Sequence, residues 1–163
     1  MKNRLLDSEG KIRNIVWILI AVLTVLLDQA AKLLVVNNLS QTDCFHVIPG
    51  VFDFVYVKNT GAAFSILSDN TALLAIVSVA FCIAIPVYWY VKKPKNRILQ
   101  TSATLLFAGA LGNAIDRIFR GYVIDFISTA FITFPVFNVA DIAITAGAVL
   151  LIIYLLFFDK EEK

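Results

Sequence analysis

Four long apolar stretches constrain this chain more than any other feature of its sequence. They cover about residues 15–36, 71–91, 98–115 and 139–158, and each approaches the roughly 20 residues that a helix needs to cross about 30 Å of hydrocarbon. Hydrophobic residues make up 60% of the 163-residue chain, and its mean hydropathy is +0.82. A soluble domain is therefore excluded. We expect one integral membrane domain over residues 1–163, mainly α-helical, with four transmembrane helices.

The basic residues gather on one side of such a four-span topology. The N-terminal segment, the link between the second and third spans and the C-terminal segment contain Lys2, Arg4, Lys11, Arg13, Lys92, Lys93, Lys95, Arg97, Lys160 and Lys163. The opposite side has only Lys58, Arg117 and Arg120. Because cytoplasmic loops are enriched in Lys and Arg, we expect both termini to be cytoplasmic. The loops at about 37–70 and 116–138 should then face outward.

The first outward loop contains residues that favour strands. Phe45–Ile48 and Val51–Val57 are β-branched and aromatic, and Pro49-Gly50 separates them. This pattern predicts two strands joined by a turn. Gly121–Phe126 in the second loop adds a further short strand. A small sheet at the membrane surface follows, where aromatic residues are favoured.

Polar and ionisable residues cluster where the third span ends and the fourth begins. The segments 112–117, 121–126 and 134–141 contain three Asp, two Asn and an Arg. Ionisable groups at membrane depth are costly, so they usually mark a functional site.

Two of these acids, Asp125 and Asp141, are candidates for a catalytic pair. Apolar neighbours desolvate the Asp125 carboxyl, which raises its pKa. Asn138 and Asp141 have the spacing of a capping box, which explains them on structural grounds equally well; a helix N-terminus also favours an ionised Asp141. If the two carboxyls meet, they share one proton, and such a pair can polarise a carbonyl and activate water. Spacing alone does not show that they meet.

Asp28 and Lys32 lie one helical turn apart within the first span. One reading is an ion pair near the outer end, with Lys32 snorkelling to the headgroups. The other is that the pair faces the bundle interior and braces the site electrostatically, and the two are compatible.

The segment Asn59–Ser65 follows the second expected strand. Asn and Gly are ordinary turn residues, so a turn is the simpler interpretation. In the functional one, Asn59 hydrogen-bonds a substrate backbone or a carboxylate, and Gly61 supplies backbone freedom.

In the third span, the small residues of 108–112 permit close helix packing. Asn113 and Arg117 share a helix face. Arg117 is expected to pair with Asp116 or with the downstream aspartates.

Together these motifs resemble lipoprotein signal peptidase, also called signal peptidase II, of aspartic peptidase family A8. The resemblance covers nearly the whole chain, in five ordered blocks. The matching segments are Asp28-Gln29 with Lys32, then 59–65, 109–117, 121–126 and 134–141.

The resemblance implies an aspartic endopeptidase of the bacterial inner membrane, with four transmembrane helices and an extracytoplasmic β-cradle. It removes signal peptides from prolipoproteins by cutting before a diacylglyceryl-modified cysteine. Asp125 and Asp141 correspond to the catalytic dyad. The supporting and substrate-binding positions are Asn59, Gly61, Asn113, Arg117, Asn138, Asp28 and Lys32.

The resemblance also implies a mobile helical element in the first outer loop, for which Ser65–Asn70 is a candidate. Membrane lipids and the inhibitor globomycin are implied partners. We expect a monomer that binds no nucleic acid.

We expect no metal and no cofactor. Cys44 and His46 supply too few ligands for a zinc site, Cys82 lies within a span, and no HExxH motif is present.

The alternatives to a peptidase are a small proton- or ion-coupled transporter that uses buried acids as a relay, and a non-enzymatic assembly factor. A Ser65/Lys58 catalytic pair is disfavoured because nothing local desolvates Lys58.

Overall fold

The computed structural model describes residues 2–61 and 70–159, with side chains from residue 14 onward. The described part contains α1 (Lys2–Asn38), β1 (Cys44–Ile48), β2 (Phe52–Asn59), α2 (Thr71–Lys92), α3 (Arg97–Arg120), β3 (Val123–Thr129) and α4 (Val139–Phe157). The prediction of a mainly helical membrane fold with a small sheet is confirmed.

All four helices are long and apolar enough to cross a membrane, the candidate span of α1 being Asn14–Asn38. α3 continues past the expected end at Ile115 to Arg120. It ends there because Gly121 adopts a left-handed conformation, with φ of 78°, and its N–H bonds back to the carbonyl of Arg117. The extra turn carries the helix from its apolar segment to the polar cluster.

α3 lies at the centre of the helical bundle and packs against the other three helices. Its small residues make this possible. A Cβ added to Gly109 would lie 2.4 Å from the carbonyl oxygen of Ala140, and one added to Gly112 would lie 2.7 Å from Oδ2 of Asp28. The predicted close packing is therefore confirmed, and it brings α1 and α4 within reach of the polar end of α3.

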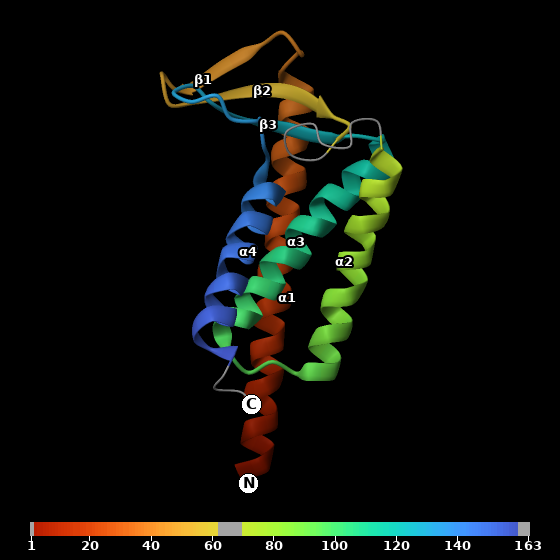
Figure 1. Ribbon diagram of the computed structural model, residues 1–163, viewed down its shortest axis with the longest axis vertical. Coiled ribbons are helices and arrows are strands. Elements are labelled where there is room, and N and C mark those ends of the chain that lie inside the picture. Colours follow the sequence, from red (N-terminus) through yellow and green to blue (C-terminus); the bar gives the residue numbers. More distant parts are fainter. Residues whose placement is uncertain (1, 62–69, 160–163) are drawn as a thin grey trace.

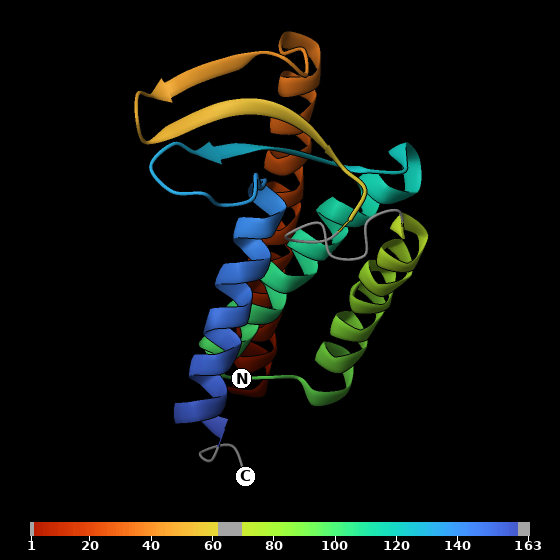
Figure 2. The same ribbon diagram turned by 45° about the horizontal axis from the view of Figure 1, so that its top comes forward.

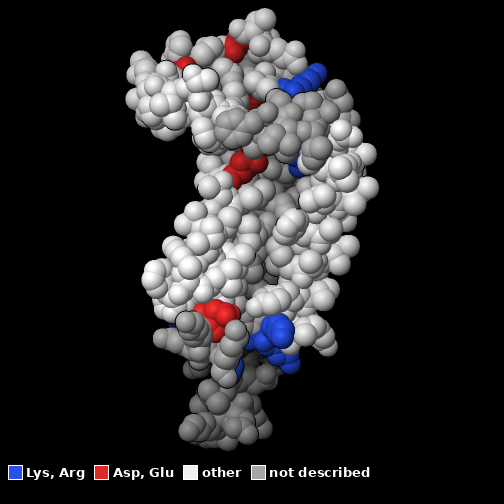
Figure 3. All heavy atoms as spheres, viewed as in Figure 1, with Lys and Arg blue, Asp and Glu red and all other residues white. Residues whose placement is uncertain are grey.

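The outer faces of the helices suit lipid. α2 packs mainly along α3 and has no buried residue, and large apolar side chains such as Ile76, Leu27 and Leu156 are exposed. On the face shown in Figure 3, charged atoms gather toward the two ends of the helices, with a broad uncharged band between them. Such a band is what a hydrocarbon layer requires.

The three strands form an antiparallel sheet in the order β1-β2-β3. It lies across one end of the bundle, and the start of α1 and the end of α4 lie at the other end (Figures 1 and 2). Gly50, with φ of 76°, makes the turn between β1 and β2. Ile124 and Phe126 of β3 pack with Val35 of α1, and Phe54 meets Phe126 edge-to-face. This apolar contact holds the sheet against the polar end of α3.

Candidate active site

Strand β3 places Asp125 at the junction of sheet and bundle. Asn59 pairs with Val123 across the strands, so its side chain lies diagonally beside Asp125 on the same face. The Asn59 amide donates to Oδ2 of Asp125 at 2.8 Å. Asp125 is 2% exposed, and this burial raises the pKa of its carboxyl to about 6, despite the amide donors that oppose the shift.

The first turn of α4 places Asp141. The expected capping box is present: the Asn138 side chain accepts from the N–H of Asp141 at 2.9 Å, and the N–H of Asn138 donates to Oδ2 of Asp141 at 3.2 Å. The amide of Asn113 on α3 donates to the other oxygen at 2.8 Å. The capping box therefore orients the Asp141 side chain through Oδ2 and leaves Oδ1 free to accept the hydrogen bond from Asn113 of α3.

Two asparagines link the carboxylates. Asn138 donates from Nδ2 to Oδ1 of Asp125 at 2.7 Å, and the same nitrogen lies 3.2 Å from Oδ1 of Asn113. The amide orientations follow from their other partners. Asn138 must turn its oxygen to the N–H of Asp141, and Asn113 turns its oxygen to Nζ of Lys32 at 3.2 Å. Both NH2 groups are therefore directed at carboxylates.

The result is a symmetric arrangement of acceptors. Each oxygen of Asp125 and of Asp141 accepts one hydrogen bond from an amide or a backbone N–H. Within the described residues, neither carboxylate has a cation within 4.0 Å. Two nearby acids without a counter-charge favour holding one proton between them.

A second pair of acids lies deeper, and it is neutralised by cations. Nζ of Lys32 is 2.8 Å from both Asp28 and Asp116, and Arg120 pairs with Asp116 as well. Lys32 is fully buried. The predicted ion pair between Asp28 and Lys32 is therefore present, but Lys32 does not snorkel, because its side chain points into the bundle, toward α3.

This ionic cluster is tied to α4, which holds Asp141, and to α3, which holds Asn113. Oδ1 of Asp28 accepts from the N–H of Ala140 at 2.9 Å, in the first turn of α4. Gln29, which the sequence did not single out as a site residue, donates to Asp28 and to the carbonyl of Gly112. Its place beside Asp28, in the first segment of the family resemblance, is the signal in the sequence that pointed to it.

Arg117 occupies the side of the site toward α2. It donates to Oγ of Ser78 and to the carbonyl of Gly61, both at 3.3 Å, and Gly61 in turn donates to the side chain of Asn59. Within the described residues Arg117 forms no ion pair within 4.0 Å: Asp116 contacts Lys32 and Arg120 instead, and Asp141 and Asp125 interact with Arg117 only at longer range. Among the residues that the structure describes, the buried Nε of Arg117 has no hydrogen-bond partner, so one donor is left beside the cleft.

These residues surround a cleft of about 1050 Å³. Asp125, Asp141, Asn113 and Arg117 line it together with Asn59 and Gly61. Val57, Ile142 and Ile144 are among its apolar walls. Figure 3 shows acidic atoms at a hollow between the sheet and the uncharged band. The cleft thus joins a polar end to an apolar one.

Two earlier expectations fall partly outside the described residues. The candidate helical element Ser65–Asn70 lies outside them except for Asn70. Ser65 of the alternative Ser65/Lys58 catalytic pair also lies outside them. Lys58 lies 5.9 and 5.2 Å from the ring centroids of Tyr56 and Tyr122, an environment that stabilises its charge.

Comparison with known proteins agrees with this architecture. The family model described as Signal peptidase (SPase) II matches residues 20–157. A lipoprotein signal peptidase of Lactobacillus gasseri is 37% identical over 92% of this chain and 97% of its own length, and one of Staphylococcus aureus is 43% identical over 90% and 92%. A bacterial membrane enzyme solved by the in meso method at 2.3 Å is 40% identical, covers 91% of this chain and 92% of that chain, and has a TM-score of 0.83.

The fold and the matches define a multi-pass membrane protease. The chain belongs to the signal peptidase II family, whose members include the lipoprotein signal peptidases. The predicted resemblance is confirmed, and the transporter alternative has no support.

Proposed function

We propose that the chain is an aspartic endopeptidase that removes signal peptides from prolipoproteins, with Asp125 and Asp141 as its catalytic residues. One observation carries the assignment of the dyad. Two contacting asparagines hold the two carboxylates in one cleft, and within the described residues neither carboxylate forms an ion pair within 4.0 Å, although Arg117 and Lys32 act on them at longer range.

Such a pair can hydrolyse a peptide bond without a covalent intermediate. The protonated Asp125 transfers its proton to the scissile carbonyl oxygen, while the ionised Asp141 takes a proton from water as the water oxygen bonds to the carbonyl carbon. A tetrahedral diol forms. When it collapses, the proton held by Asp141 passes to the leaving nitrogen and the C–N bond breaks, while the diol returns a proton to Asp125.

The neighbouring residues position this pair. Asn59, Asn113 and Asn138 orient the carboxylates, while Arg117 and Gly61 border the cleft where a substrate backbone passes. Asp28 and Lys32 brace the helices beneath. Because the cleft extends from these polar groups to apolar walls between the helices, it suits a substrate that has both a peptide bond and lipid chains.

We propose that the substrate is cut before a cysteine that carries diacylglyceryl. The scissile bond lies at the sheet end, and the apolar part of the signal peptide stays in the bilayer. The distribution of Lys and Arg favours cytoplasmic termini, which puts the cleft at the outer surface of the bacterial cytoplasmic membrane. The protein acts as a monomer, and globomycin competes with the substrate.

The experiment compares purified Asp125→Asn and Asp141→Asn with wild type on a diacylglyceryl-modified precursor. Because general acid–base catalysis alone contributes about 10²–10⁴-fold, each variant should lose at least about a thousandfold in kcat. Thermal unfolding in detergent verifies that both remain folded. Asp43→Asn is the matched control, since Asp43 lies in the exposed loop before β1, and it should cleave at the wild-type rate.

A second arm tests the substrate. The same precursor without its diacylglyceryl group should be cut far more slowly, and globomycin should inhibit wild type. Retained turnover in either Asn variant contradicts the dyad. Equal rates on the two precursors contradict the lipid requirement and leave the dyad standing.

A further inference from the structure

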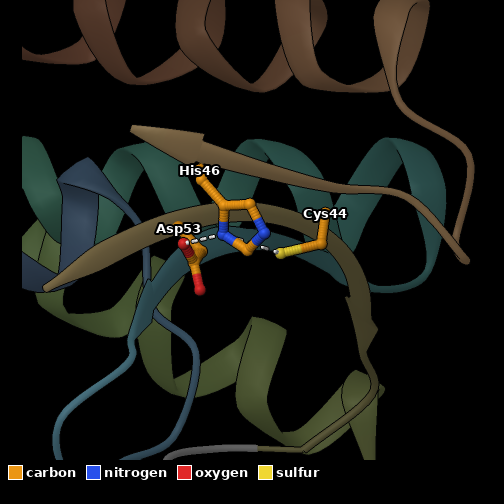
Figure 4. Close-up of side chains that lie close together, drawn as sticks. All are labelled: Cys44, His46 and Asp53. Atoms are coloured by element: carbon orange, nitrogen blue, oxygen red, sulfur yellow. Dashed lines mark hydrogen bonds and ion pairs between the residues drawn. The ribbon is translucent and has the colours of Figure 1, made fainter. Parts of the chain in front are cut away.

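A second cluster of reactive side chains lies on the sheet, outside the cleft. The ladder pairs His46 of β1 with Asp53 of β2. Cys44 lies two residues before His46, so both side chains leave the same face of β1. None of the three residues lines the cleft. Figure 4 shows the three side chains converging on the imidazole ring of His46.

The ligand atoms have the spacing that a small metal site needs. Nδ1 of His46 is 2.7 Å from Oδ1 of Asp53 and 3.9 Å from Sγ of Cys44. One donor atom from each residue lies within 4.8 Å of the other two. Bonds of about 2.0–2.3 Å in a tetrahedron separate neighbouring ligands by roughly 3.5 Å, so small side-chain movements complete the site.

The donor set indicates which metal it takes. A thiolate, an imidazole and a carboxylate suit Zn²⁺, whereas Mg²⁺ prefers oxygen ligands alone. His46 is 65% exposed in its side chain, which leaves room for a water molecule as fourth ligand.

We propose that Cys44, His46 and Asp53 bind Zn²⁺ and that the ion links β1 to β2. β1 is an edge strand, paired only with β2 among the described strands, and all five of its residues are exposed. Few side-chain contacts therefore hold it in place. An ion bound by both strands supplies a cross-link there, and this inference does not depend on the proposed peptidase mechanism.

The test measures binding on the full chain in detergent, purified with an affinity tag that contains no histidine. Isothermal titration with Zn²⁺ should show one site per chain, and Mg²⁺ should not compete. Cys44→Ser, His46→Gln and Asp53→Asn should each weaken binding by at least about tenfold, since even outer partners of metal ligands contribute 10–100-fold. Cys82→Ser and Asp43→Asn are the matched controls and should bind as wild type does.

Co²⁺ distinguishes this site from loose surface binding. It should give the near-ultraviolet charge-transfer band of a cobalt–thiolate bond, and Cys44→Ser should lose that band while Cys82→Ser keeps it. The proposal is overturned if wild type binds Zn²⁺ no more tightly than a variant that combines Cys44→Ser, His46→Gln and Asp53→Asn, or if the wild-type Co²⁺ complex lacks the thiolate band. Circular dichroism of each variant verifies that the fold is kept.

Discussion

The molecule holds two pairs of aspartates near the polar end of α3, and the surroundings of the two pairs differ. Asp28 and Asp116 share Lys32, and Arg120 adds a second cation to Asp116. Asp125 and Asp141 receive only amide and backbone donors within the described residues. The first pair is neutralised by ion pairing. The second pair is not neutralised by direct ion pairing among the described residues, and a proton shared between its two acids relieves their mutual repulsion.

The same contrast explains which pair is structural. The Asp28 carboxylate caps an N–H in α4 and contacts Lys32, so it joins α1 to α4. Lys32 also accounts for the orientation of Asn113, whose amide reaches Asp141. The neutralised pair therefore builds the support on which the uncompensated pair is held. The two predictions that follow test each half of this contrast, from the larger effect to the smaller.

Lys32→Met should give the largest loss of stability. It leaves two buried carboxylates with one remaining cation, and breaking a buried ion pair on one side usually costs about 3–5 kcal/mol. Arg120→Gln is the comparison variant. Because the Arg120 side chain is 26% exposed and Asp116 keeps Lys32, its loss should be about 1 kcal/mol.

Reversible unfolding in mixed micelles measures both free energies. If Lys32→Met and Arg120→Gln lose similar amounts, the ionic cluster is not organised around Lys32. That result would contradict the claim that the Asp28–Asp116 pair is a structural cluster held together by Lys32.

Asn59→Ala should shift the pH dependence of catalysis by less than one unit. Burial puts the pKa of Asp125 at about 6, so kcat/KM should fall as pH rises through that value and the dyad loses its proton. The Asn59 amide stabilises the charged carboxylate of Asp125. Removing the amide therefore raises the pKa of Asp125, and the fall in kcat/KM moves to higher pH. Asp43→Asn, in the exposed loop before β1, is the control, and its kcat/KM should fall over the same pH range as that of wild type. A downward shift in Asn59→Ala would show that the fall in kcat/KM belongs to another group.

Much of this arrangement could be predicted from the sequence, because hydrophobic length and strand patterning determine it. The spans, the turn at Gly50 and the capping box at Asn138 all follow from local residue chemistry. The ion pair between Asp116 and Arg120 could also be predicted from the sequence, because Arg120 lies one helical turn after Asp116. Arg117 is adjacent in sequence and therefore points in another direction.

Other features depend on the placement of one element against another. Local sequence leaves Lys32 equally suited to snorkelling or to burial, and only the close approach of α1 to α3 decides between them. Similarly, Cys44 and His46 are two ligands until the strand register sets Asp53 opposite His46. That register includes an irregularity between His46 and Ile48, which no residue pattern predicts.

The central claim is that Asp125 and Asp141 share a proton that the ion-paired acids do not need. Infrared difference spectra of the purified protein, recorded across a pH titration, test it most directly. We predict a protonated-carboxyl C=O band that is present below pH of about 6, disappears as pH rises, and is missing in Asp125→Asn. A wild-type spectrum without such a band, or a band that titrates unchanged in both Asp125→Asn and Asp141→Asn, would contradict the account.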